Sequence, residues 1–108
     1  MYNIYMIANE VDDKVYIGST KKTITIRLSQ HISDARRRSH SQLNDAMNQY
    51  GYDKFAVFLL ETAMTKEESK LIETRYMLQY DTVRNGYNKE YAVDKAVAMD
   101  MILDMYHN

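Results

Sequence analysis

A small group of polar and aromatic side chains has the residue types that phosphodiester hydrolysis would need. Tyr5 and Tyr16 stand in two short apolar segments. Arg27 and His31 are four residues apart, which places them one turn apart on the same side of a helix. Glu73 lies further along the chain. Phosphodiester hydrolysis needs an activated water, stabilisation of charge on the phosphoryl oxygens and help for the leaving oxygen.

Each of these side chains suits one part of that chemistry. A single carboxylate such as Glu73 suits Mg²⁺, which prefers oxygen ligands and keeps several waters. Arg27 offers a planar fork of donors that matches phosphate oxygens. Tyr5 or Tyr16 could orient or deprotonate the attacking water, although a tyrosine base needs a nearby cation because its usual pKa is about 10. His31 can contact phosphate or shuttle a proton.

Every one of these residues also has a structural explanation. The chain contains ten tyrosines, and tyrosines in strands usually pack in a core. Arg27 could pair with Asp34 on the same helix edge, or form a purely structural bridge with Glu73. Asn88 could simply stitch a turn. The joint pattern, rather than any single residue, favours a functional site.

Three short segments have the composition of β-strands, and helical patterns fill the space between and after them. Residues 4–8 and 14–19 flank a polar turn and predict a hairpin, and residues 54–61 predict a third, well-buried strand. Helices are predicted to start at Thr23, at Ser39 or Ser41, at the Thr65–Glu68 capping box and near Tyr91, with stops near Arg38, Gly51, Tyr80 and Tyr106.

The predicted order of elements is β-β-α-α-β-α-α. A three-stranded sheet is not stable in water with both faces bare, so the helices must cover it. We therefore expect an α/β (α+β) fold, in which a small three-stranded antiparallel sheet is flanked by helices. At 108 residues the chain is long enough for one modest core.

Two triplets in the predicted hairpin resemble a known family. Asn3-Ile4-Tyr5 and Tyr16-Ile17-Gly18, whose tyrosines are eleven residues apart, look like the two triplets that name the GIY-YIG nucleases. Asn3 stands where that family usually has glycine. Asparagine is among the residues that best tolerate unusual backbone angles, so we expect the change to be accommodated.

Further positions extend the resemblance over about residues 2–90. The family follows its triplets with an arginine, a histidine one turn later, a glutamate on a helix and an asparagine, and the matching residues here are Arg27, His31, Glu73 and Asn88. His40 and the Gly86-Tyr87-Asn88 triplet are similar to those of the intron-encoded homing endonucleases in the family.

The resemblance implies a metal-dependent endonuclease that hydrolyses a DNA phosphodiester bond by water attack. It implies one Mg²⁺ (or Mn²⁺) ion per active site with Glu73 as the metal ligand, and a tyrosine as the base, with Tyr5 slightly favoured over Tyr16. The implied catalytic residues are Tyr5, Tyr16, Arg27, His31 and Glu73, supported by Gly18, His40 and Asn88. The alternatives are a catalytically silent nucleic-acid-binding module and a nuclease for structured or RNA substrates.

The net charge of −1 conceals an uneven distribution. Residues 14–40 hold seven basic residues and one acidic residue, a balance of +6, whereas the rest of the chain holds seven basic and fourteen acidic residues, a balance of −7. A basic segment in an acidic protein suggests a contact with a polyanion. An arginine run at a helix end also suits the helix dipole. The candidates for contact with nucleic acid are Lys21, Lys22, Arg36, Arg37 and Arg38.

The predicted domains are a nuclease-like domain at 1–90 and a C-terminal helix at 91–108, packed on the domain or used to form a homodimer. The residues after Asn88 hold four acidic and two basic residues, so they suit DNA poorly, and we expect low intrinsic sequence specificity. There is no cysteine, no apolar run of about 20 residues and no secretion signal at the N-terminus. These features predict an intracellular protein, in the cytoplasm or nucleus of a cell or host, that is neither secreted nor in a membrane.

Overall fold

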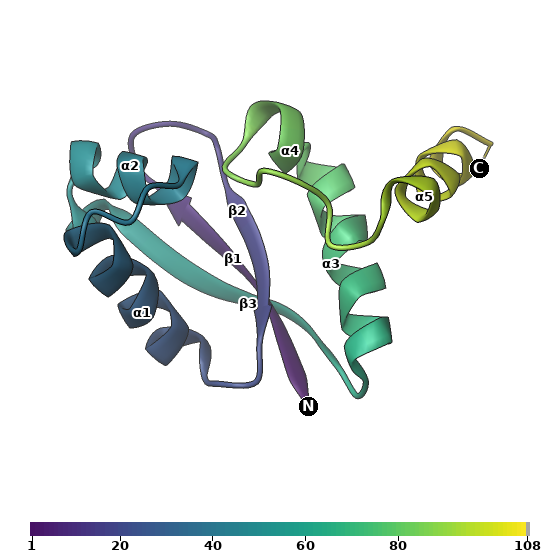
Figure 1. The fold of residues 1–108 in the computed structure, drawn as a ribbon, viewed down its shortest axis with the longest axis horizontal. Coiled ribbons are helices and arrows are strands. Elements are labelled where there is room, and N and C mark those ends of the chain that lie inside the picture. Colours follow the sequence, from purple (N-terminus) through teal and green to yellow (C-terminus); the bar gives the residue numbers. More distant parts are fainter. Residues whose placement is uncertain (108) are drawn as a thin grey trace.

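The computed structural model describes the backbone of residues 1–107 and the side chains of residues 1–105. Its centre is a three-stranded antiparallel sheet (Figure 1). The strands are β1 (Tyr2–Asn9), β2 (Tyr16–Thr20) and β3 (Phe55–Ala63), in the order β2-β1-β3. The predicted fold class and the predicted hairpin are both confirmed.

Helices follow the hairpin and the third strand. They are α1 (Ile24–Arg36), α2 (Gln42–Tyr50), α3 (Lys66–Tyr80) and α5 (Lys95–His107), with two short elements, the 3₁₀ helix η1 (Tyr52–Lys54) and α4 (Thr82–Asn85). The predicted order is confirmed, with η1 and α4 as additions too short to show a helical pattern. Within residues 1–107, no helix has the length and apolar character that crossing a membrane requires.

Local capping signals set the ends of two helices as the sequence predicts. Of the two alternatives for α2, Ser41 is the cap, and its hydroxyl accepts a hydrogen bond from the Asn44 backbone N–H. Gly51 ends α2 at φ 101°, a backbone conformation that favours glycine. The Thr65 hydroxyl accepts from the Glu68 N–H at the start of α3.

Side chains along β1 point alternately to the two faces of the sheet. Helices cover both faces. Tyr5 and Ile7 pack in a cluster with α1 and α2, whereas Ile4 and Met6 pack in a second cluster with α3. Figure 1 shows α1 and α2 on one side of the strands and α3 on the other. As the central strand, β1 therefore belongs to both cores, and its odd-numbered side chains face α1.

The third strand is less buried than its composition predicts. Phe58 and Leu59 are 48% and 53% exposed, so the predicted well-buried strand is wrong in this respect. β3 lies at an edge of the sheet, and its pairing with β1 shifts register between Ile4 and Tyr5. Only its ends, at Phe55 and Ala63, are fully covered by the helices.

A side-chain hydrogen bond also moves the predicted start of the second strand, while the predicted start of α1 is kept. The second strand begins at Tyr16 rather than Lys14, because the Asp12 carboxylate accepts from the Lys14 N–H and prolongs the turn. Thr23 precedes α1 as predicted but makes no capping hydrogen bond with its side chain.

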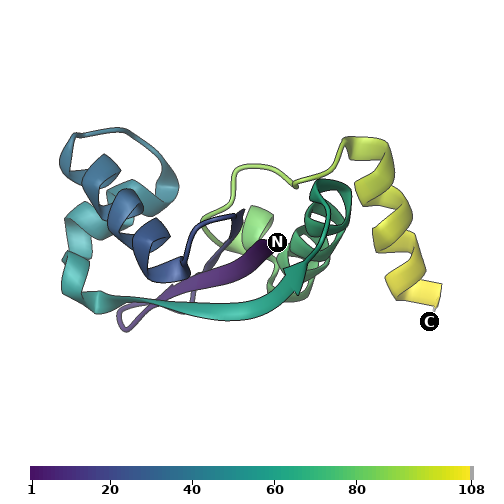
Figure 2. The same ribbon diagram turned by 90° about the horizontal axis from the view of Figure 1, so that it is seen from below.

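The last helix starts at Lys95 rather than near Tyr91. The Asp94 carboxylate accepts a hydrogen bond from the Val97 N–H and so caps this end. α5 lies against α3, with Ala98 only 3% exposed, on the side of the molecule away from α1 (Figures 1 and 2). The side chain of Tyr106 and the whole of Asn108 lie outside the described part of the chain.

Candidate active site

Three aromatic side chains from β1, β2 and α1 meet in the middle of the molecule. The Tyr5 hydroxyl lies 2.9 Å from Nε2 of His31, and Tyr5 and His31 are 1% and 7% exposed. The Tyr16 ring centroid lies 5.2 Å from that of His31 and 6.2 Å from that of Tyr5. The predicted pairing of the two strand tyrosines with α1 is therefore present as a compact cluster.

Gly18 makes room for this cluster. It pairs with Tyr5 across the hairpin, and a Cβ atom at Gly18 would lie 2.5 Å from the Tyr5 hydroxyl oxygen and 2.9 Å from Cε1 of Tyr16. Such distances are too short for any side chain, so glycine is required here by close approach. The glycine of the second triplet therefore leaves the space that both tyrosine side chains occupy.

Asn88 and Asn3 secure the backbone on either side of the cluster. The buried Asn88 amide accepts from the Ile17 N–H and donates to the Ile17 carbonyl, both at 2.9 Å. Asn3 lies in the extended backbone of β1, and its amide donates to the Lys22 carbonyl at 3.0 Å. The departure from glycine at Asn3 therefore needs no unusual backbone angle.

A cavity of about 440 Å³ opens beside the cluster. Tyr16, Arg27, His31, Asp34 and Glu73 line it, together with residues 87–92. Glu73 comes from α3, so the cavity draws on elements from both sides of the sheet. Tyr5 lies behind this wall, next to Tyr16 and His31.

Arg27 reaches the cavity without an acidic partner. Among the described side chains, ion pairs join His40 to Asp45, Arg75 to Glu61 and Arg84 to Asp81. The structural bridges from Arg27 to Asp34 or Glu73 are therefore absent from this set. The guanidinium makes a long contact of 3.5 Å with the Gln30 side chain. Its donors are available to an anion in the cavity.

Burial governs protonation in the cluster. It raises the pKa of Tyr5 and of Tyr16 above the usual value for tyrosine, while the Arg27 guanidinium lowers both. Burial, and then Arg27, lower the pKa of His31 to about 4. His31 is therefore neutral near pH 7. With its proton on Nδ1, it can accept a hydrogen bond from the Tyr5 hydroxyl.

Glu73, like Asp34 and Glu90, lines the cavity with a carboxylate that could hold a metal ion. Burial raises its pKa, while a hydrogen bond with Ser19 and the charge of Lys70 lower it. The described residues contain no group of three or more His, Cys, Asp or Glu side chains arranged around one metal position. Mg²⁺ does not need such a group, because it commonly takes one or two carboxylates, several waters and substrate phosphates. Glu73 at an open cavity fits that pattern.

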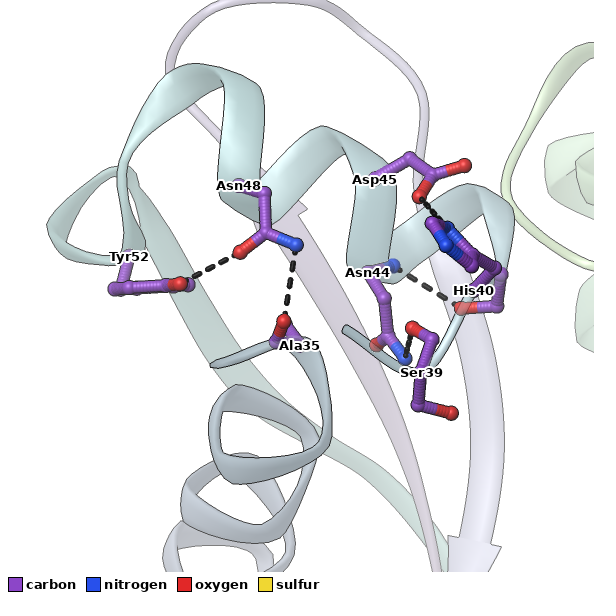
Figure 3. Close-up of polar contacts among 8 residues, drawn as sticks. Ala35, Ser39, His40, Asn44, Asp45, Asn48 and Tyr52 are labelled. Carbon is purple, nitrogen blue, oxygen red and sulfur yellow. Dashed lines mark hydrogen bonds and ion pairs between the residues drawn. The ribbon is translucent and has the colours of Figure 1, made fainter. Parts of the chain in front are cut away.

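His40 is not part of this cluster. It lies between α1 and α2, its side chain is 82% exposed, and Nδ1 contacts the Asp45 carboxylate at 3.2 Å (Figure 3).

The basic candidates are also spread over different surfaces. Lys21 lies 5.1 Å over the ring of Tyr2, and the Arg36 guanidinium lies 4.9 Å over the ring of Tyr52.

Several residues of the site were not identified from the sequence. Ser19 hydrogen bonds with Glu73, and Lys89, Glu90 and Tyr91 line the cavity. Ser19 directly follows the second triplet, which was the signal for its position. The stretch after Asn88 carries no pattern of its own and is placed by the long-range contact of Asn88 with β2.

Comparisons with known proteins agree with this geometry. Residues 1–88 match the family model of the GIY-YIG catalytic domain. The uncharacterised protein 019R of Invertebrate iridescent virus 6 is 36% identical over 90 residues, which are 80% of this chain and 32% of that protein. The putative MSV199 domain-containing protein 146R of the same virus is 31% identical over 88 residues, which are 80% and 36% of the two chains. The chain thus spans about a third of the length of these relatives.

Two solved structures share the fold, and both are of the catalytic domain of the intron endonuclease I-TevI. A mutant form has a TM-score of 0.77 at 29% identity, covering 86% of this chain and 98% of that one. A second structure has a TM-score of 0.71 at 28% identity, covering 82% and 97%. The chain belongs to the GIY-YIG family, and its residues 1–88 correspond to the catalytic domain of that family.

Proposed function

We propose that the protein is a metal-dependent endonuclease that hydrolyses DNA by attack of water on a phosphodiester bond. One observation carries this proposal. Tyr16, Arg27, His31 and Glu73 converge on a single cavity from three different elements, and Arg27 makes no ion pair there with a described side chain. An arginine that lines an open cavity and makes no ion pair suits a phosphate ligand better than it suits a packed core.

Arg27 binds the scissile phosphate and stabilises the charge that builds up on its oxygens. Tyr16, in the cavity wall, orients the attacking water. Tyr5 is the proposed base; its hydroxyl hydrogen bonds with neutral His31, and a cation bound in the cavity would have to offset the rise in its pKa that burial causes. Gly18 and Asn88 hold the two tyrosines in register, and His40, with its exposed ring, is a proposed contact to phosphate.

Glu73 would hold one Mg²⁺ or Mn²⁺ ion. When bound, such an ion would polarise the phosphoryl group and lower the pKa of a coordinated water. The charge of this cation would then offset the unfavourable effect of burial on the ionised form of Glu73.

DNA is the proposed substrate, and the basic segment at 14–40 supplies the positive field that attracts it. Contacts of this kind reach the phosphate backbone and carry no sequence information, which supports low intrinsic specificity. We also propose that the protein acts inside a cell or host. Pairing of two chains through α5 remains a proposal, supported by Met99, Leu103 and Met105, which are each at least half exposed.

A plasmid-nicking assay with Mg²⁺ tests the function. We expect Glu73→Ala and Arg27→Ala each to slow nicking about a hundredfold or more, and EDTA to abolish it. Glu67→Ala and Arg75→Ala are matched controls, because both residues are exposed on α3 away from the cavity, and they should cut normally. Equally weak cleavage by wild type and Glu73→Ala, across metals, would favour the silent binding module. A parallel panel of RNA and branched DNA tests the other alternative.

A further inference from the structure

A second, smaller depression continues the active-site cavity along α1. It has a volume of about 300 Å³ and is lined by Arg27, Gln30, Ser33, Asp34 and Arg37. Arg27 and Asp34 line both depressions. The two adjoin at these residues, and together they mark a path, the groove, from the proposed catalytic arginine toward the C-terminal end of α1.

The helical repeat explains why these residues share one face. Steps of three or four residues return to the same side of a helix, and Arg27, Gln30, Asp34 and Arg37 follow such steps. Ten residues rise about 15 Å along a helix. Because one strand of DNA rises about 3.4 Å per nucleotide, the groove is long enough for several phosphates rather than one.

The three consecutive arginines at the end of α1 are not equivalent. Arg37 lines the groove, whereas Arg36, about 100° further round the helix, has its guanidinium 4.9 Å over the Tyr52 ring. Arg38 lies past the end of α1 with a φ of 64°, and its N–H donates to the Ala35 carbonyl. Arg37 is thus the arginine of this run that faces the same groove as Arg27.

Hydrogen bonds hold this arrangement in place. The Asn48 amide of α2 donates to the Ala35 carbonyl at the end of α1, and the Tyr52 hydroxyl donates to the Asn48 side chain at 2.6 Å (Figure 3). Arg36 therefore stacks on a ring whose position is fixed relative to α1. This separates Arg36 from the groove by packing and not only by its place on the helix.

We propose that this groove holds the DNA strand next to the scissile phosphate, and that Arg37 contacts a phosphate several nucleotides from the cut. Gln30 and Ser33 offer neutral donors to the same backbone. The Asp34 carboxylate lies where the two depressions meet and repels phosphate there, so the strand is gripped on either side of it, at Arg27 and at Arg37. The inference rests on the proposed function, because Arg27 must bind the scissile phosphate for the groove to lead away from it.

The first test measures binding of a labelled DNA duplex in EDTA, so that no cleavage occurs, over a range of salt concentrations. Arg37→Gln is compared with Arg36→Gln, a matched loss of one charge from the neighbouring position. Affinity falls as salt rises, and loss of one phosphate contact should make the slope of log affinity against log salt less steep by about 0.9. The same loss should weaken binding about eightfold at 0.1 M salt. Arg36→Gln should leave the slope unchanged. Equal effects of the two variants would overturn the proposal.

The second test locates the contact. Single phosphates around the cleavage position are replaced one at a time by uncharged methylphosphonates. In the wild type, one such position at a distance from the cut should weaken binding, and in Arg37→Gln the same replacement should have no further effect. If the two losses simply add at every position, Arg37 contacts no particular phosphate and the proposal fails. A contact that appears with duplex RNA and not with DNA would also overturn it.

Both side chains are exposed, so neither substitution removes a buried contact, and thermal unfolding of the two variants should match the wild type. Failure of the groove and failure of the proposed function give different results. A wild type that never nicks DNA contradicts the function, whatever the salt slopes are. If the wild type nicks normally and the salt slopes of Arg37→Gln and Arg36→Gln are identical, only the proposal about the groove is contradicted.

Discussion

The Tyr5 hydroxyl and Nε2 of His31 form a hydrogen bond of 2.9 Å between the central strand and α1. Both side chains are buried, so each satisfies a polar atom that would otherwise lack a partner. The bond also fixes where α1 lies on the sheet, and with it the position of Arg27 one turn before His31. The arrangement of the site therefore depends on one contact between groups that are 26 residues apart.

Acid should destabilise the protein through His31. Its pKa is about 4 in the folded chain and about 6.5 when unfolded, so the unfolded state binds more protons between these values. Stability is therefore lost as the pH falls from about 6.5 to about 4, by at most about 3 kcal/mol from this group. The measurement is urea unfolding of wild type and His31→Gln at several pH values. The difference between their free energies of unfolding should shrink toward pH 4, and a constant difference would contradict a neutral His31.

Gly18→Ala should damage both stability and activity. The new methyl group would overlap the Tyr5 hydroxyl, so Tyr5 must move away from His31. We expect a loss of about 1–3 kcal/mol in the free energy of unfolding and a nicking rate about a hundredfold lower. Gly51→Ala is the control, because its φ of 101° makes it costly for stability while it lies far from the cavity. Folded Gly51→Ala should cut at the wild-type rate. Normal cutting by Gly18→Ala would show that Tyr5 has room to adjust.

Asn88→Ala should loosen β2 at the second triplet. It removes two hydrogen bonds and leaves the Ile17 N–H and carbonyl without partners in a buried site. The expected cost is about 2–4 kcal/mol. Hydrogen exchange of the Ile17 amide should become faster, which NMR can follow residue by residue. The control is Asn85→Ala, since the Asn85 side chain is exposed and bonds only within its own turn, to Asp81. Protection of Ile17 that survives in Asn88→Ala would contradict this role.

Glu73→Gln should make the protein more stable and less active. Burial raises the pKa of Glu73, so the folded state binds more protons than the unfolded state above the usual pKa of glutamate, and stability from this group falls as the pH rises there. The uncharged variant avoids that penalty, and its melting temperature at pH 7 should rise by a few degrees, about the effect of 1 kcal/mol or less. Adding Mg²⁺ should raise the melting temperature of the wild type and not that of Glu73→Gln. A variant less stable than the wild type would contradict the unfavourable burial.

Local signals account for much of the successful prediction from sequence. The caps at Ser41 and Thr65 and the stop at Gly51 depend on neighbouring residues, so they can be recognised without a tertiary fold. Apolar spacing likewise identifies α1 and α2. Local hydrogen bonds of Asp12 and Asp94 moved the starts of β2 and α5, whereas the error in β3 arose because the tertiary fold decided the outcome. Phe58 and Leu59 look like core residues, yet β3 is an edge strand that the helices cover only in part.

The sequence alone determined the order of the elements, because spacing, capping and residue type are local properties, and its resemblance to a family selected the candidate residues for phosphodiester chemistry. The tertiary structure decided which of these residues meet. Placing β1 between β2 and β3 brings Tyr5 against Gly18 and His31 and lets Glu73 reach the same cavity from α3. It leaves His40 in solvent and separates Arg37 from Arg36. Such contacts depend on strand order and helix rotation, which no single segment of the chain encodes.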